Sequence, residues 1–221
     1  MAAKKRLTQR REEPLSRERI VAEAIALLDA SGEDGLTFRA LAERLQTGAG
    51  AIYWHVDGKD ELLAVATDAL VDATLAAAAA DDGIRAIALG LFDAMDAHPW
   101  LGAQLSRAPW KDSTLRVFER IGRVMMADGV PRGVQFTAAS SLVSYIVGVG
   151  SQNAANASRF PGTDREDFLG AAAAEWEALD ADAYAFTRSV AGALRAHDDR
   201  AEFLAGIDLF LAGIGRGYPS R

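Results

Sequence analysis

Apolar residues spaced three and four positions apart run through almost the whole chain, and this spacing constrains the fold more than any other feature. It is the spacing of one face of an α-helix, whereas a half-buried strand alternates apolar and polar residues. No segment shows that alternation convincingly, and glycine or proline interrupts the helical pattern at intervals. The sequence therefore predicts an all-α protein of about nine or ten helices and no sheet.

The composition limits the kinds of site that the chain can hold. Half of the 221 residues are hydrophobic and a quarter are charged, as in a soluble globular protein. Because cysteine is absent, disulfides and thiolate metal ligands are excluded. The three histidines lie far apart and outside any His-Glu-x-x-His pattern, so we expect no catalytic site, no metal and no cofactor. No apolar run reaches the length of a membrane span and no secretory signal is recognisable, which predicts a cytoplasmic protein with no membrane partner.

The formal net charge of −7 conceals a basic N-terminal segment. Residues 1–19 contain seven Lys or Arg against three Glu. We predict that residues 1–15 form a disordered basic arm. Such an arm is either a solubilising tail or, beside a DNA-binding module, a contact for phosphates or the minor groove.

Residues 16–60 have the pattern of a small helical domain. Ser16 is a suitable N-cap for a first helix and Gly32 a suitable end, and Thr37 is a suitable N-cap for a second helix. A third, very short helix is expected from about Ala49 to Val56. Two helices joined by a short glycine-containing turn, with a supporting helix in front, are the signature of a helix-turn-helix.

The third helix places its large rings away from its apolar face. Ala49, Ile52 and Val56 share one face at spacings of three and four. Trp54 lies about 200° around the axis from Ile52 and so should point away from the core, with Tyr53 and His55 at the flanks. The alternative is that another part of the chain covers Trp54. An exposed cluster of this kind suits a nucleic-acid groove, because Tyr and His donate to phosphates and Trp makes apolar contacts.

The segment from Glu18 to Leu63 resembles the DNA-binding domain of the tetracycline-repressor (TetR) family. The resemblance rests on "GLTFRALA", on "YWHV" and on the Lys that follows it. It implies a homodimeric, all-helical regulator that joins an N-terminal DNA reader to a ligand-binding and dimerisation domain, here residues 61–221. The segment "FLAGIDLFLAGI" resembles the last, dimer-forming helix of the family.

The resemblance also implies which residues contact double-stranded operator DNA. They come from the second helix, the third helix and the start of the fourth: Arg39, Ala49, Gly50, Ala51, Tyr53, Trp54, His55 and Lys59. Thr47, in the turn, is a possible further contact, although a turn role suits it better. Many relatives have polar side chains at the start of the third helix where this chain has "GAGA". We therefore expect sparse base reading, by Arg39 and alanine methyl groups, supplemented by DNA shape.

Two helices of the body carry small or apolar stripes that predict a dimer face. Small residues recur on the helix near 131–157, and apolar residues on the helix from about residue 199. Two such helices from each subunit would form an isologous four-helix interface, although packing within one chain gives the same periodicity. The predicted face consists of Ser141, Ser144, Gly148, Ser151, Phe203, Ile207, Phe210 and Ile214.

Aromatic and interspersed polar residues of the body are candidates for an effector pocket. Most should be core residues, but pockets are lined by the same types. The candidates are Phe92, His98, Trp100, Trp110, Phe118, Met126, Tyr145, Gln152 and Trp176. They indicate a small apolar or aromatic effector.

These features together predict a ligand-responsive regulator, most simply a repressor that binds a palindromic operator as a homodimer. The effector would displace the helix that starts near Lys59, change the separation of the two recognition helices and release the DNA. Two alternatives remain at this point: a helical enzyme that binds a small molecule, and an architectural DNA-binding protein without a ligand.

Overall fold

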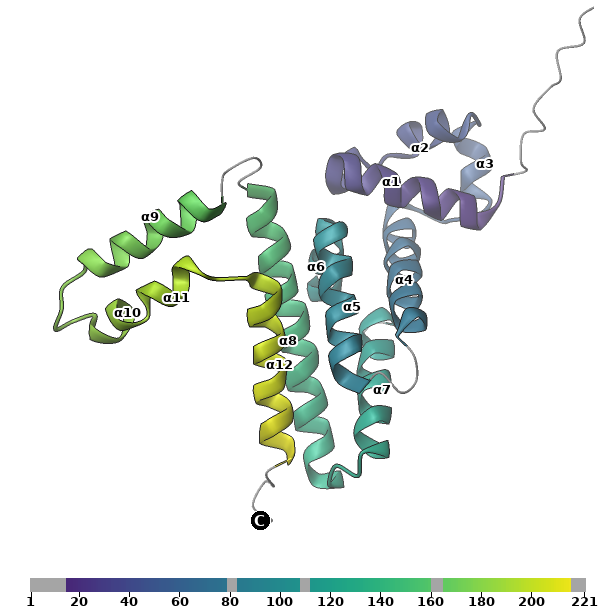
Figure 1. The fold of residues 1–221 in the computed structure, drawn as a ribbon. Coiled ribbons are helices and arrows are strands. Elements are labelled where there is room, and N and C mark those ends of the chain that lie inside the picture. Colours follow the sequence, from purple (N-terminus) through teal and green to yellow (C-terminus); the bar gives the residue numbers. More distant parts are fainter. Residues whose placement is uncertain (1–14, 79–82, 108–111, 160–164, 216–221) are drawn as a thin grey trace, which may run out of the picture. The chain divides into compact units, whose positions relative to one another are not determined.

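The computed structural model describes residues 15–78, 83–107, 112–159 and 165–215 (Figure 1). Within these residues it contains twelve helices and no strand, which confirms the all-α class. Nine of the helices have eight residues or more and three have five. The helices are α1 (Arg17–Gly35), α2 (Phe38–Leu45), α3 (Ala49–Tyr53), α4 (Lys59–Ala77), α5 (Gly83–Ala97), α6 (Pro99–Arg107), α7 (Asp112–Ala127), α8 (Arg132–Arg159), α9 (Arg165–Ala178), α10 (Ala185–Ser189), α11 (Ala191–Arg195) and α12 (Asp199–Gly215).

The described count exceeds the nine or ten helices expected because the segment before α12 breaks into one-turn pieces. Val190 and Ala196 leave the helical region at φ −104° and −94°, so α10 and α11 remain separate five-residue helices. No glycine or proline marks these two breaks, and the periodicity of the sequence does not reveal them.

The chain divides into two compact units, one ending at Ala66 and the other starting at Thr67. Both this boundary and the division expected after residue 60 fall in the first half of α4. The first unit holds α1 to α3 and the start of α4, and the second unit holds the remaining helices.

Helices α1 and α2 begin at the expected caps. The Ser16 hydroxyl accepts from the Arg19 N–H at 3.3 Å, and the Thr37 hydroxyl accepts from the Ala40 N–H at 3.1 Å. Gly32 has the expected positive φ of 63°, but the chain resumes one further turn as far as Gly35. Gly32 therefore kinks α1 instead of ending it.

The 28-residue helix α8 is the central element of the second unit, with packing partners α5, α6, α7 and α12. Among the described residues, Arg132–Ala157 within α8 is the one segment long and apolar enough to cross a membrane, with a mean hydropathy of 1.2. Its buried residues, such as Leu142 and Ile146, belong to the core of the unit. This weak feature of a packed helix does not indicate a membrane protein.

Helices α6 and α8 pack closely where Gly102 faces Ser151. A Cβ added to Gly102 would lie 2.9 Å from the Ser151 Cα, which is closer than real Cβ contacts. Alanine at this position would gain about 1 kcal/mol of helix propensity but would force the two helices apart, at a cost of about 1–3 kcal/mol. We expect Gly102→Ala to lower the free energy of unfolding, measured by urea denaturation.

Gly122 of α7 provides a matched control, because a Cβ there would meet no atom within 4 Å. Gly122→Ala should leave stability unchanged or raise it by up to about 1 kcal/mol. The close approach at Gly102 would be contradicted by a Gly102→Ala protein as stable as the Gly122→Ala protein.

Candidate functional sites

The third helix is shorter than the sequence indicates. It runs only from Ala49 to Tyr53 and begins at Gly48, which makes no side-chain cap. The carbonyl of Ile52 accepts from the N–H groups of both His55 and Val56, so the last turn tightens and the helix ends before Val56. The predicted end at Val56 was therefore wrong by three residues, although Trp54 keeps a helical backbone conformation.

The orientation of this helix agrees with the periodicity argument. Ile52 and Val56 are buried at 0% and 2% exposure, whereas Trp54 is 90% exposed. No described residue of the first unit therefore covers Trp54. Ala49 and Ala51 are half-buried and Gly50 is exposed, with open space where its Cβ would lie.

Tyr53 has both a structural contact and an exposed edge. Its ring stacks on Phe38 of α2, with centroids 4.2 Å apart and planes 4° from parallel, and 54% of the residue remains exposed. The stack holds the Tyr53 ring of α3 against the Phe38 ring of α2. His55 follows at the turn and is half-buried.

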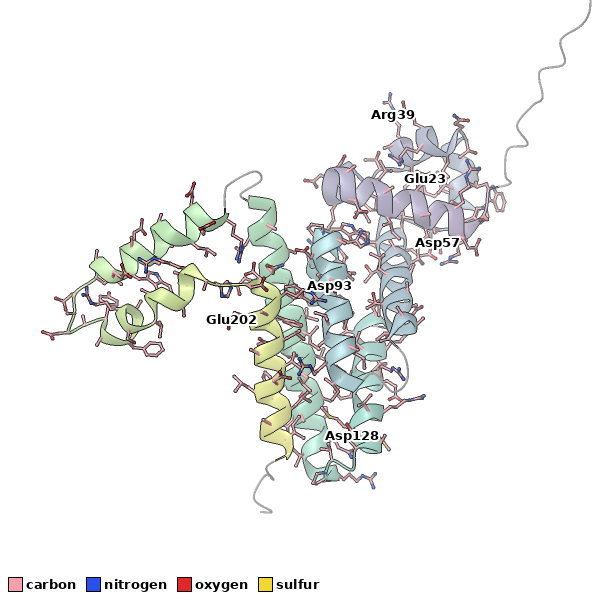
Figure 2. The ribbon with its side chains drawn as sticks, in the orientation of Figure 1. Glu23, Arg39, Asp57, Asp93, Asp128 and Glu202 are labelled. Carbon is pink, nitrogen blue, oxygen red and sulfur yellow. The ribbon has the colours of Figure 1, made fainter. Side chains whose placement is uncertain are left out.

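Arg39 is the cation of α2 that points into open space. Figure 2 shows its side chain projecting away from the helices of the first unit, and the residue is exposed. It makes no ion pair or hydrogen bond with any residue that the structure describes. Thr47, by contrast, is half-buried and donates its N–H to the Ala42 carbonyl at 3.0 Å, after Gln46 at φ 53°. The turn role suits Thr47 better than a base contact.

Lys59 has a contact that sequence reasoning missed. Its ammonium group donates to the carbonyl of Glu33, in the last turn of α1. The first residue of α4 is therefore tied to the end of α1. Lys59 remains exposed, and an ammonium group has three donors, so this contact leaves it able to meet a phosphate as well.

Glu61 is a second residue that sequence reasoning missed. One carboxylate oxygen accepts from the Asp57 N–H, and the other lies 2.8 Å from the Arg17 guanidinium. Glu61 thus joins the turn after α3, the start of α4 and the start of α1. The spacing "DGKDE" is close to a capping box, which was the available signal.

We expect Glu61→Ala to destabilise the first unit, because it removes an N-terminal cap and an ion-pair partner together. The loss should be about 1 kcal/mol. Asp60→Ala is the control, since Asp60 is exposed in the same turn. It should cost less than Glu61→Ala, because it removes only a favourable charge near the helix N-terminus. Urea denaturation followed by circular dichroism measures both, and equal losses would contradict the role of Glu61.

The eight residues predicted for the dimer face do not share one surface of the protomer. Phe203 and Ile207 are buried, at 1% and 0% exposure, and Phe203 stacks on Phe92 and Tyr145 with centroids 4.6 and 5.6 Å apart. Ser151 faces Gly102 of α6. These three side chains therefore pack within the chain, because α12 and α8 are apolar on more than one side.

Three of the remaining dimer candidates, Ser141, Phe210 and Ile214, line a shallow apolar groove between α8 and α12. The groove has a volume of about 480 Å³, and Leu209 at its edge is 76% exposed. Gly206 lies under the Tyr145 hydroxyl, so a small residue is needed there inside the protomer. The groove is lined by Val134, Thr137, Ala138, Ser141, Tyr145, Gly206, Leu209, Phe210, Gly213 and Ile214. Ser144 and Gly148 are exposed on α8.

The predicted pocket residues do not converge. Trp100 is buried, Tyr145 donates to the Phe203 carbonyl, and Met126 is 67% exposed. Phe118 packs edge-on against Phe136, and His98 against Trp100. Gln152 is exposed on α8, Trp176 is half-buried on α9, and Trp110 lies outside the described residues. Of the eight that the structure describes, only Phe92 lines the cleft between α5, α8, α9 and the start of α12.

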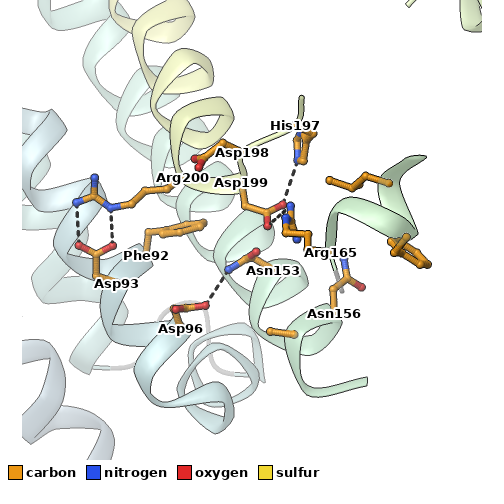
Figure 3. Close-up of a pocket in the computed structure, with 13 residues that line it drawn as sticks. Phe92, Asp93, Asp96, Asn153, Asn156, Arg165, His197, Asp198, Asp199 and Arg200 are labelled. Carbon is orange, nitrogen blue, oxygen red and sulfur yellow. Dashed lines mark hydrogen bonds and ion pairs between the residues drawn. The ribbon is translucent and has the colours of Figure 1, made fainter. Parts of the chain in front are cut away.

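That cleft has a volume of about 690 Å³ and lies between α5, α8, α9 and the start of α12 (Figure 3). Two groups of charges border it. On one side Arg200 donates to both oxygens of Asp93, at 3.0 and 3.1 Å, which raises the pKa of the guanidinium. On the other side Asp199 lies 2.5 Å from Arg165 and 3.0 Å from His197.

Two further carboxylates, those of Asp96 and Asp198, and several amide and apolar groups complete the lining of the cleft. Asp96 accepts from the amide of Asn153 at 3.1 Å, and Asn156 lies nearby. Phe92, Phe168 and Leu169 contribute apolar surface. The cleft is therefore considerably more polar than the apolar pocket expected from the sequence.

A three-helix unit that exposes a short aromatic helix, joined to an all-helical body, defines a helix-turn-helix protein. Comparison with protein families agrees with this class. The model described as bacterial regulatory proteins, tetR family, matches residues 20–66, and the tetracyclin repressor-like C-terminal domain matches residues 80–217. The chain therefore belongs to the TetR family.

Individual relatives agree with this assignment. An HTH-type transcriptional regulator of Saccharopolyspora erythraea is 32% identical over 63% of this chain and 62% of its own length. The repressor DrrR1 of Streptomyces coeruleorubidus is 29% identical over 61% of this chain and 52% of its own. The matches thus span between half and two thirds of these curated relatives.

A solved structure covers the chain more completely. The transcriptional regulator SCO7222, a TetR from Streptomyces coelicolor, is 56% identical, with a TM-score of 0.84 over 91% of this chain and 98% of that chain. ActR from the same organism, solved in complex with actinorhodin, is 24% identical with a TM-score of 0.73, covering 94% of this chain and all of its own, and it shows the shared fold.

Proposed function

We propose that this chain is a ligand-responsive repressor that binds a palindromic operator as a homodimer. The observation that carries the proposal is the exposed face of the first unit, where Trp54, Tyr53 and Arg39 project outward while Ile52 and Val56 are buried. The regulatory names of the relatives support the same function and argue against the enzyme alternative.

On DNA, some residues of the exposed face would contact the phosphate backbone and others the bases. Tyr53, His55 and Lys59 carry donors suited to phosphate oxygens, and Trp54 offers apolar surface to sugars or a thymine methyl. Arg39 is the candidate for a bidentate guanine contact, since its guanidinium has no partner among the described residues. With Ala49, Gly50 and Ala51 at the start of α3, shape and close backbone approach supply the remaining selectivity.

A second copy of this chain is the proposed occupant of the α8–α12 groove. The groove is apolar, and Leu209 and Phe210 would be covered by the same surface of the partner in an isologous contact. Dimerisation places two recognition helices on half-sites one helical turn apart, about 34–36 Å on B-DNA.

Helix α4 would carry the response to the effector, because charged contacts fasten its first turn and its middle. Its first turn is tied to the first unit through Lys59 and Glu61. In the second unit Asp68 and Asp72 lie 2.5 and 2.8 Å from Arg116 of α7. An effector that binds more tightly when α4 is in one of two positions shifts the protein toward that position. The separation of the recognition helices changes with it, and the size of the shift is set by the difference in effector affinity between the two positions.

A reporter experiment tests the regulatory function. The DNA upstream of this chain's gene is placed before a reporter, and the chain is supplied from a second promoter. We expect lower expression with the chain than without it, and recovery when Arg39→Ala replaces it. Expression that does not respond to the chain would contradict repression at this site.

A further inference from the structure

We propose that the cleft between α5, α8, α9 and α12 binds an organic cation that carries an aromatic ring. This inference rests on the proposed function, because it names the chemical class of the effector. The sequence alone indicates an apolar molecule, and the lining of the cleft changes that expectation.

The cleft has the dimensions of a ligand site. Its volume of about 690 Å³ lies inside the range of roughly 300–1,000 Å³ that drug-sized ligands occupy. Its walls come from three long helices and the start of a fourth, so the lining residues are far apart in the sequence. It is a concave site with amide, ionic and aromatic walls, and not a patch of carboxylates on one helix.

The charge of the lining favours a cation. Four carboxylates, from Asp93, Asp96, Asp198 and Asp199, face two guanidinium groups. Both guanidinium groups are already engaged: Asp93 holds Arg200 through two hydrogen bonds, and Asp199 holds Arg165. With His197 neutral, the lining therefore carries a formal charge of −2.

Of the four carboxylates, Asp96 and Asp198 form no ion pair with a described residue, although Asp198 also attracts the Arg200 guanidinium. The hydrogen bonds of these two carboxylates come from neutral groups, the Asn153 amide and the Ala201 N–H respectively. Neutral donors orient a carboxylate without cancelling its charge. Both aspartates are exposed, so solvent screens part of the attraction that a cation in the cleft gains from them.

Aromatic surface in the same cleft favours a ring on that cation. Phe168 of α9 is 47% exposed and lines the cleft beside Leu169, whereas Phe92 of α5 is only 4% exposed because its ring stacks on Phe203. Ring faces attract cations as well as apolar groups. A wholly apolar ligand would desolvate the carboxylates without compensation, and an anion would be repelled by them.

Three probes with the same ring system test the inference: 2-naphthylmethylamine, naphthalene-2-methanol and 2-naphthoate. Each is titrated calorimetrically into the full chain without DNA, at neutral pH. We expect the amine to bind, the alcohol to bind more weakly and the carboxylate not to bind. In Asp96→Asn and in Asp198→Asn, amine affinity should fall at least about fivefold, with little change for the alcohol.

Asp128→Asn, at the exposed end of α7 and outside the cleft, is the matched control and should leave amine affinity unchanged. Circular dichroism melts establish that each variant is folded. The inference is overturned if the amine does not bind, if 2-naphthoate binds as tightly, or if both cleft variants keep the wild-type affinity. Because no DNA is present, failure of the cleft inference is distinct from failure of operator binding.

Discussion

Replacing Leu209 by Glu is expected to abolish operator binding while leaving each protomer folded. Leu209 is 76% exposed, so a charged side chain there does not disturb the core of the protomer. In an isologous dimer, however, two copies of the new carboxylate lie in one apolar interface. Loss of the dimer converts a two-site complex on DNA into single-site contacts, which should weaken operator affinity at least about a hundredfold.

Sedimentation equilibrium and fluorescence anisotropy with operator DNA measure these two effects. Leu115→Glu is the control, because Leu115 is another exposed leucine, on α7 and outside the α8–α12 groove. It should leave both the dimer and the DNA affinity unchanged. A Leu209→Glu protein that remains dimeric would show that α8 and α12 do not form the interface.

Replacing Trp54 by Ala is expected to produce the second large effect, a loss of DNA affinity without loss of stability. The side chain is 90% exposed, so its removal takes almost no packing from the fold. A tryptophan at the centre of an interface contributes strongly when DNA covers it, and we expect affinity to fall about thirtyfold. Anisotropy measures the affinity, and thermal denaturation should give an unchanged midpoint.

Tyr53→Phe separates the two roles of the neighbouring ring. The phenyl ring keeps the stack on Phe38, so stability should be retained, while the loss of the hydroxyl removes a phosphate donor. A small loss of affinity that is equal for all DNA sequences is the expected result, measured with the same anisotropy assay. Loss of discrimination between sequences would mean that Tyr53 reads bases.

The local periodicity of apolar residues was sufficient to predict which face of α3 is buried and which is exposed. The spacing of Ile52 and Val56 places these side chains in the core and turns Trp54 outward, as the structure shows. The caps at Ser16 and Thr37 were predictable for the same reason, since each depends on residues within one turn.

Contacts between distant segments could not be predicted in this way. The bond from Lys59 to the Glu33 carbonyl joins residues 26 positions apart, and no local pattern encodes it. On α12, apolar residues surround much of the helix, so periodicity could not show that Phe203 points inward and Leu209 outward. The cleft depends on four helices that meet only in the folded chain, and its aspartates carry no sequence signature.

The most direct test of the account is the affinity of the full chain for its own palindromic operator, compared with the same duplex after one half-site is scrambled. Fluorescence anisotropy at physiological salt is the measurement, because salt governs the non-specific part of the affinity. We expect two protomers to bind each intact duplex, and the intact site to be preferred over unrelated DNA by about a thousandfold or more. Equal affinity for the intact, half-scrambled and unrelated duplexes would contradict this expectation.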